Sequence, residues 1–360
     1  MTTSNGIRVA IAGLGNCASS LIEGIYYYRQ NPETDDGLLF PNLAGYSVCD
    51  IEVATAFDIS SNKVGKSIGE AIYQTPNNFV RIPNVQVDGT ARVYRGLTLD
   101  GNPEHLARFV HESDEKPVDV ISVLKDLDID VLVNLLPTGS LEATEFYAHC
   151  ALEAGCAFIN CIPTVLAQRP DMQELYSRRQ LPLLGDDIKS QIGTTILHRA
   201  LLHLLESRGA MLHKTSQVNI GGNTDFANFV YRAESKLVSK RKSLARYLHE
   251  NTDFHVGHHY DPTKGPLKNA FIEIEARVFG GSPVKISIKL ESDDKPNSAG
   301  SVVDLIRIAK GALDKNMGGL VSDACAFYFK SAPTPMDDLQ ALEMIRHNWV
   351  DLYAEVPERI

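Results

Sequence analysis

The sequence is short of basic residues and of long apolar runs. Lys and Arg total 35 against 45 Asp and Glu, which gives a formal net charge of −10. Proteins that bind nucleic acids or membrane surfaces usually carry a basic excess, so we expect neither kind of partner. No apolar run approaches the roughly 20 residues that a membrane-spanning helix needs, so we expect no membrane anchor either.

The cysteines and histidines do not form the pattern of a disulfide framework or a metal site. There are six cysteines, with no C-x-x-C pair and no zinc-like spacing. A chain of 360 residues does not need disulfides to stabilise a core, so we expect free thiols and a cytoplasmic location. His255, His258 and His259 lie close together but without an accompanying carboxylate pattern, and we expect them to be surface residues.

Apolar runs and helical periodicities alternate over the first half of the chain. Strands are expected at residues 7–12, 52–57, 131–136, 157–161 and 182–184, and helices at 19–24, 117–125, 141–154, 171–178 and 196–205. This alternation predicts an α/β fold with a Rossmann doubly wound parallel sheet, which binds ligands at the carboxyl ends of its strands. Residues 26–50 are rich in Tyr, Asn, Pro and Gly and are expected to be a surface excursion.

The pattern changes after residue 209. Residues 271–279 and 284–290 alternate between apolar and polar side chains around a Gly-Gly turn, which predicts a half-buried hairpin. A strand is expected at residues 215–220 and a loop at residues 261–269, and helical spacing returns at 300–313 and 336–347. We therefore expect a first domain over residues 1–200, completed by residues 300–360, and an α+β domain with a mixed sheet over residues 201–299.

A glycine-rich turn lies between the first strand and the first helix. Its sequence, Gly13-Leu14-Gly15-Asn16-Cys17-Ala18, matches G-x-G-x-x-A, the dinucleotide-binding fingerprint. The first glycine permits the tight turn, and the second lets a pyrophosphate approach the backbone.

The second expected strand ends in Asp58. An acid at this position can accept both ribose hydroxyls of a dinucleotide, which favours NAD over NADP. Asp58 lies about twice as far from the glycines as is usual. It would serve equally well as the cap of a helix at residues 60–65, and both interpretations stay open here.

Polar residues follow the ends of the later strands. Pro137, Thr138 and Gly139 follow one strand, and Asn160 lies at the end of the next. Carboxyl ends of parallel strands meet at one edge of the sheet, so we expect these residues to contact a cofactor.

The stretch from residue 182 to residue 209 reads as a strand, a polar turn and an amphipathic helix. Its turn contains Ser190, Gln191, Gly193 and Thr194. Hydroxyls and a glycine around the free amides of a helix N-terminus make a phosphate cradle. Ser and Thr also cap helices with no ligand present, so the sequence leaves both roles open.

Several charged residues stand out for their position. Lys236 and Lys240 lie on one helical face, where a bound anion would offset their repulsion, although a solvated basic face fits equally. Asp304 lies among apolar residues and is expected either to pair with a lysine or to face outward. Lys289 and Lys330, taken singly, are compatible with surface lysines whose stems cover apolar neighbours.

Together, these segments resemble the myo-inositol-1-phosphate synthase family in its shorter bacterial and archaeal form. The landmarks span nearly the whole chain: VAIAGLGNCASSL, AFDISSNKVG, LTLDG, LLPTGS, GDDIKSQIGTT, NIGGNTDF, SKLVSK, KPNSAGSVVD and FYFKSAP. The resemblance implies an NAD-dependent isomerase that converts D-glucose 6-phosphate to 1L-myo-inositol 1-phosphate. The implied steps are oxidation at C5, enolisation, attack of C6 on C1 and re-reduction. A homotetramer with the second sheet in its interface is also implied, and a requirement for a monovalent or divalent cation stays open.

The resemblance also implies a role for each matching residue. The catalytic residues would be Lys236, Lys240, Lys289 and Lys330, with Asp187 and Asp304 as the acids that orient them. The cofactor contacts would be Gly13, Gly15, Asn16, Cys17, Asp58, Asn62, Pro137, Thr138, Gly139, Asn160, Asp187 and Asp225, with Asn223 close by. The substrate phosphate would be held by Ser190, Gln191, Gly193, Thr194 and Lys240. Ammonium groups suit this chemistry because they stabilise an alkoxide or enolate at C5 and an oxyanion at O1.

Some segments depart from the commonest bacterial forms of the family. They include Leu135, Thr138 and residues 160–164, 232–239, 255–269 and 292–295. These departures leave open a relative that closes another hexose phosphate, such as fructose 6-phosphate, to a five-membered cyclitol phosphate. A non-catalytic NAD-binding sensor is a further alternative, which the retention of all four lysines and both acids disfavours. An ordinary dehydrogenase would accumulate NADH.

Overall fold

A seven-stranded parallel sheet organises the first half of the protein. The computed structural model describes residues 6–102, 107–223, 226–227, 244, 247–248 and 252–353. The strands are β1 (Ile7–Ala12), β2 (Ile51–Asp58), β3 (Val93–Arg95), β4 (Val131–Asn134), β5 (Ala157–Asn160), β6 (Pro182–Leu184) and β11 (Gly319–Leu320). Their order is β11-β6-β5-β4-β1-β2-β3, and every neighbouring pair is parallel. The chain direction across the sheet reverses between β1 and β4, which is where doubly wound sheets bind ligands.

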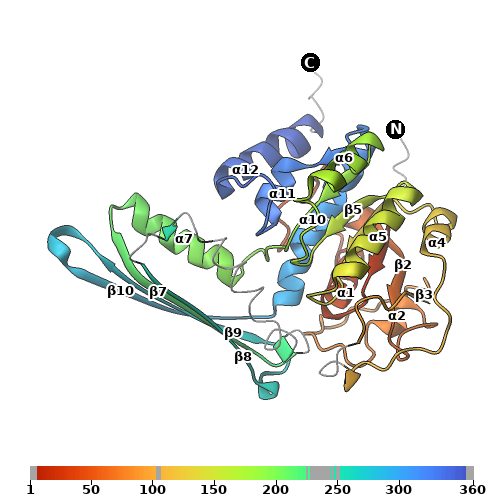
Figure 1. Cartoon of the computed structure of the whole chain (residues 1–360), viewed down its shortest axis with the longest axis horizontal. Coiled ribbons are helices and arrows are strands. Elements are labelled where there is room, and N and C mark those ends of the chain that lie inside the picture. Colours follow the sequence, from red (N-terminus) through yellow and green to blue (C-terminus); the bar gives the residue numbers. More distant parts are fainter. Residues whose placement is uncertain are drawn as a thin grey trace.

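Helices cover both faces of this sheet (Figure 1). They are α1 (Asn16–Gln30), α2 (Ile68–Ala71), α4 (Val120–Asp126), α5 (Leu141–Ala154), α6 (Pro170–Arg178), α10 (Asp294–Asp314), α11 (Ser322–Tyr328) and α12 (Asp338–Ile345). Helices α1 and α10 share one apolar core with the sheet, and α4, α5 and α6 share the other. The predicted Rossmann architecture is therefore confirmed. In the described part of the chain, no helix is long and apolar enough to cross a membrane.

A second sheet extends away from the first (Figure 1). Its strands are β7 (Met211–Gly221), β8 (Asp253–Tyr260), β9 (Lys268–Arg277) and β10 (Pro283–Ser292), in the order β10-β9-β7-β8. β7 and β8 are parallel and the other pairs are antiparallel, so the expected mixed sheet and hairpin are confirmed. Helix α7 (Thr194–Ser207) packs on one face of this sheet through Leu202 and Leu205. Helix α10 then leads the chain from β10 back to the parallel sheet.

The segment at residues 26–50 is not the surface excursion that its composition predicts. Helix α1 continues to Gln30, and Phe40, Leu43 and Val48 are buried in the core that α1 shares with α10. Arg307 of α10 holds this segment in place by donating to the carbonyl oxygens of Phe40, Pro41 and Tyr46. Apolar residues scattered among turn formers are enough to fix the segment once a buried cation satisfies its carbonyl groups.

Two further elements differ from the expectation. Residues 253–260 form strand β8, although the sequence there lacks a period-two apolar pattern. Its backbone pairs with β7 at the edge of the sheet, which requires no particular side chains. Helix α10 begins at Asp294, so the PNSAG motif lies in its first turns rather than before it.

Candidate active site

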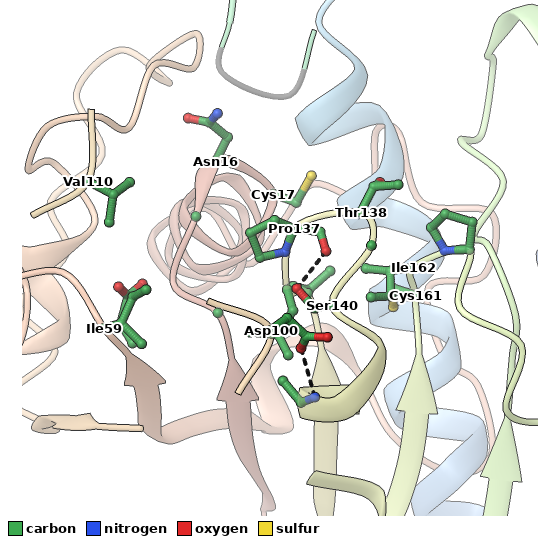
Figure 2. Close-up of a pocket in the computed structure, with 18 of the residues that line it drawn as sticks. Asn16, Cys17, Ile59, Asp100, Val110, Pro137, Thr138, Ser140, Cys161 and Ile162 are labelled. Carbon is green, nitrogen blue, oxygen red and sulfur yellow. Dashed lines mark hydrogen bonds between the residues drawn. The ribbon is translucent and has the colours of Figure 1, made fainter. Parts of the chain in front are cut away.

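A cavity of about 360 Å³ lies at the carboxyl ends of the parallel strands. The glycine turn, the loop at residues 97–102 and the turn at residues 137–140 line one side of it. The other side is lined by Asp187, Ile188, Ser190, Asn223, the first turns of α10 and Lys330. Figure 2 shows Asn16 and Cys17 at the start of α1 beside the Pro137–Ser140 turn, with Cys161 and Ile162 to the right of that turn. The cavity therefore joins the predicted cofactor residues to part of the predicted catalytic set.

The glycine turn has the geometry of a phosphate cradle. Gly13 has a φ of 90°, and a β-carbon there would lie 2.9 Å from the carbonyl oxygen of Leu135, so only glycine fits. Gly15 is the N-cap of α1, and a β-carbon added to it would meet no atom within 4 Å. Open space directly in front of a helix N-terminus suits a bound phosphate group.

Asp58 accepts hydrogen bonds from backbone amides on either side of it, residues 60–65 form a turn and not a helix, and its contact with a ribose stays a prediction. Its Oδ2 accepts from the amide of Leu14 at 3.0 Å, and its Oδ1 accepts from the amide of Ser60 at 2.8 Å. Lys63 lies 3.5 Å from the carboxylate and donates to the carbonyl oxygen of Leu14 at 2.8 Å. Asp58 and Lys63 therefore tie the end of β2 to the glycine turn at the edge of the cavity. Asn62 donates to Thr75 instead, and does not line the cavity.

The turn after β4 is capped by a residue that the sequence analysis did not single out. The carboxylate of Asp100 accepts from the amides of Leu141, Glu142 and Ala143 at 2.7, 2.9 and 2.9 Å, and so caps α5 inside the cavity (Figure 2). Asp100 belongs to the LTLDG segment, so the family resemblance in the sequence already pointed to this position.

Asn160 was expected among the cofactor contacts, but it lies in a buried network behind the cavity. It accepts from Asn134 at 2.9 Å and donates to the carbonyl oxygen of Thr164 and to Asp186, both at 2.7 Å. Asp186 also accepts from two backbone amides, and these bonds oppose the rise in its pKa that burial causes. The network ties together the ends of β4, β5 and β6.

Asp187 and Lys330 form a second charged pair in the lining of the cavity, besides Asp58 and Lys63. Lys330 Nζ donates to Asp187 Oδ1 at 2.8 Å and to the carbonyl oxygen of Ile188 at 2.6 Å. The backbone amide of Lys330 also donates to the carbonyl oxygen of Asp187 at 2.8 Å, so main chain and side chain both fix the pair. Asp187 has a φ of 62°, a left-handed conformation that Asp adopts more readily than most residues.

Only part of the predicted phosphate cradle lines the cavity. Ser190 does so, and its hydroxyl lies 3.0 Å from that of Ser298 on α10. Gln191 donates to the carbonyl oxygen of Gly37. Gly193 is the N-cap of α7, and Thr194 is buried against Asn219, so these three residues lie behind the lining.

The structure does not bring all of the predicted catalytic residues together. Lys289 lies on the face of β10 that α7 does not cover, pairs with Glu291 at 3.2 Å and does not line the cavity. Asp304 is buried, and burial raises its pKa. Its partners are Arg307 and the hydroxyl of Tyr328, not the lysine that the sequence suggested.

Three predicted residues, Lys236, Lys240 and Asp225, lie outside the described residues. The three histidines lie on β8, and no cluster of three or more possible metal ligands occurs within the described ranges. Two lysines of the cavity, Lys63 and Lys295, lie in the AFDISSNKVG and KPNSAGSVVD segments but carry no local signal of a functional role.

Comparison with known proteins relates this chain to a family. The family model for myo-inositol-1-phosphate synthase matches residues 193–295. The inositol-3-phosphate synthase of Mycolicibacterium smegmatis is 42% identical over 351 residues, which cover 94% of this chain and 96% of that protein. The chain belongs to the myo-inositol-1-phosphate synthase family. The inositol-3-phosphate synthase of Mycobacterium tuberculosis, 41% identical over 343 residues and 93% of each chain, agrees with this.

Solved structures extend the family relationship to the fold. The crystal structure of Ari2 superposes with a TM-score of 0.80 at 33% identity, covering 95% of this chain and 98% of that one. A myo-inositol-1-phosphate synthase-related protein from Thermotoga maritima gives a TM-score of 0.75 over the same shares of the two chains, and at 24% identity it supports the fold alone. The resemblance to the myo-inositol-1-phosphate synthase family drawn from the sequence motifs is confirmed.

Proposed function

We propose that this protein is an inositol-3-phosphate synthase that converts D-glucose 6-phosphate to 1L-myo-inositol 1-phosphate. The main support is that one cavity contains both a dinucleotide-type glycine turn and the Lys330–Asp187 pair. The chain is also 42% identical to a curated enzyme of this name. The substrate is inferred from the family, and it fits a cavity whose lining includes ammonium, carboxylate and hydroxyl groups.

NAD is the cofactor of this proposal. The open space at Gly15 would receive its pyrophosphate, and Asp58 at the end of β2 would receive its ribose hydroxyls. When bound, NAD supplies a reversible acceptor for the hydride at C5. Pro137, Thr138 and Gly139, which line the cavity between the two sides, would contact the nicotinamide half. A requirement for a cation stays an open part of this proposal.

Lys330 is assigned to the C5 oxygen. An ammonium group has three N–H donors, and the described contacts of Lys330 use two of them, to Asp187 and Ile188. The third would donate to the C5 oxygen, where it stabilises the negative charge that develops as the hydroxyl loses its proton and again in the enolate. Asp187 holds this ammonium in position through their 2.8 Å contact. Lys236 is assigned to the same side of the substrate.

The remaining predicted residues are assigned to the other end of the substrate. Ser190 and Ser298 lie in the cavity as neutral donors for the phosphate, and Lys240 and Lys289 are assigned to the phosphate and to O1. Lys289 pairs with Glu291 on the face of β10 that α7 does not cover, so its part in this assignment comes from the family resemblance alone.

The domain division and the tetramer are also part of the proposal. Residues 1–200 with 300–360 would form the NAD-binding unit, and residues 201–299 the catalytic and oligomerisation unit. The face of the second sheet opposite α7 carries exposed side chains such as Phe271, and Phe279 at the hairpin tip is 99% exposed. Burial of this face in a homotetramer would remove that apolar surface from water. Light scattering on the purified protein measures the assembly.

One incubation tests the proposed activity. The protein is given glucose 6-phosphate and NAD, the product is identified by NMR, and NADH is followed by absorbance. Inositol phosphate should form without NADH accumulation, because the hydride is returned in each turnover. A parallel incubation with fructose 6-phosphate tests the five-membered ring alternative. The absence of product from glucose 6-phosphate, or steady NADH accumulation, would overturn the proposal.

A further inference from the structure

A buried ion pair lies where the chain passes from the second sheet to the parallel sheet. β10 ends at Ser292, Asp293 is the N-cap of α10, and Lys295 is in the first turn of that helix. Lys295 Nζ lies 2.7 Å from Asp293 Oδ1, and the two side chains are 2% and 5% exposed. Lys295 also lines the cavity described above.

Asp293 connects this pair to the cofactor side of the cavity. Its Oδ2 accepts from the backbone amide of Val80 at 2.9 Å. Two residues before Val80, the amide of Asn78 donates to Asn16 at 2.6 Å, and the side chain of Asn77 donates to the carbonyl oxygen of Leu14 at 3.1 Å. The loop that Asp293 holds is therefore the loop that supports the glycine turn.

Lys295 connects the pair to the opposite side. Its Nζ donates to the carbonyl oxygen of Pro266 at 2.7 Å, in the loop that precedes β9. The same loop packs closely against the turn after β7. A β-carbon added to Gly222 in that turn would lie 2.6 Å from the carbonyl oxygen of Asp261 in the loop. That turn carries Asn223, which lines the cavity.

Asp293 suits the helix N-terminus because it caps α10, accepting from the amide of Lys295 at 3.1 Å, but the Lys295 side chain does not. A cation in the first turn of a helix opposes the helix dipole, and a buried ion pair often contributes no more than an apolar pair would. Its contacts reach both walls of the cavity. We propose that Asp293 and Lys295 are positioning residues. They fix the position of the cofactor wall of the cavity, which contains the glycine turn, relative to the substrate wall, which contains Asn223.

This inference rests on the proposed function, because that reaction needs both ligands to stay aligned through several steps. A hydride leaves C5, the ring closes, and a hydride returns to the same carbon. A displacement of about 1 Å between the walls is enough to slow such a step by about a hundredfold. Misalignment after the oxidation would also let the oxidised sugar and NADH separate before the ring closes.

The test compares Lys295→Met, Asp293→Asn and the double variant with wild type. Lys310→Met is the matched control, since Lys310 lies on the same helix, pairs with Asp314 at 2.6 Å and does not line the cavity. We expect kcat to fall at least about tenfold in both single variants with a smaller change in KM. We also expect free NADH per product to rise, and the double variant to be no slower than the worse single variant. A variant that merely folds less well would lose activity without releasing NADH.

Hydrogen exchange gives a second measurement that needs no turnover. In wild type, NAD binding should slow amide exchange across the cavity at residues 261–267, and Lys295→Met should abolish this effect. The inference is overturned if Lys295→Met keeps kcat and NADH release within twofold of Lys310→Met, or if NAD protects residues 261–267 equally in both. If wild type itself makes no inositol phosphate, the proposed function fails, and the exchange experiment still decides whether the pair couples the two walls.

Discussion

Lys330→Met should lower both the free energy of unfolding and the rate of inositol phosphate formation, and a second variant can distinguish these two effects. Wild-type Lys330 Nζ contacts Asp187 at 2.8 Å, and the exposed fractions of the two side chains are 16% and 3%. Removing one partner of a buried ion pair typically costs 3–5 kcal/mol, because the remaining charge stays buried. Water can reach the lysine position, so we expect the lower end of this range, about 3 kcal/mol. Inositol phosphate formation should fall below detection.

The double variant Lys330→Met/Asp187→Asn gives the decisive comparison. The amide carries no charge, so stability should return to within about 1 kcal/mol of wild type. Asn also adopts the left-handed conformation of position 187 without added strain, which Ala would not. Activity should stay absent, because neither the ammonium nor the carboxylate is present.

Urea unfolding measures the stabilities, with Trp349 as the reporter. It is the only tryptophan of the chain, it is 2% exposed, and its indole N–H donates to Asp323 at 2.8 Å. Lys125→Met, at an exposed position of α4, is the control and should stay within about 0.5 kcal/mol of wild type with full activity. The reasoning is refuted if the double variant is as unstable as Lys330→Met, or if Lys330→Met keeps more than a tenth of wild-type activity.

Four further substitutions test separate parts of the structure. Gly15→Ala should leave unfolding unchanged and weaken NAD binding at least about tenfold by calorimetry, whereas Gly13→Ala should destabilise the fold itself, because its β-carbon would meet Leu135. Burial, reinforced by Arg199, lowers the pKa of Lys189 from 10.5 to about 8. Between these two pH values the unfolded chain binds more protons than the folded chain, so the free energy of unfolding rises with pH. Relative to Lys189→Met, the free energy of unfolding of wild type should rise by about 2 kcal/mol from about pH 7.5 to about pH 9.5, measured by urea unfolding. A difference between the two proteins that does not change with pH would contradict this. Arg307→Met should cost about 3 kcal/mol or more, since it leaves the buried Asp304 carboxylate without its cation, and a loss below about 1 kcal/mol would show that the pair is dispensable.

Elements with strong local signals could be predicted from the sequence. The predicted bounds of β1 and α5 match the structure, because an apolar run flanked by glycine and an amphipathic segment ending at Gly155 each define their own limits. Gly155 has a φ of 88°, which is the conformation that ends a helix. Strand β8 could not be predicted in this way, because its edge position rests on backbone pairing and its side chains show no alternation.

Partners of buried charges were the least predictable part of the candidate site. The sequence suggested a lysine for Asp304, and the structure has Arg307 one helical turn away together with Tyr328. Asp100 caps a helix that begins 41 residues later, and Val80 reaches Asp293 across 213 residues. No local pattern encodes such a pairing, since the residue types involved are also common on surfaces.

Hydrogen bonds and ion pairs between residues far apart in the sequence fix the two sides of the cavity. The sequence motifs identify only some of the residues on each side. The glycine turn and the KPNSAG segment were both recognised in the sequence, but their connection through Asn78, Val80, Asp293 and Lys295 required the fold. Residues 292–295 stood out in the sequence as a departure from related proteins, and Lys295 is also the first residue of the KPNSAG motif. The side chains of Asp293 and Lys295 are buried between the two sides of the cavity, so under the positioning role proposed above a change at either residue would alter the spacing of those sides while the glycine turn and Lys330 stay the same.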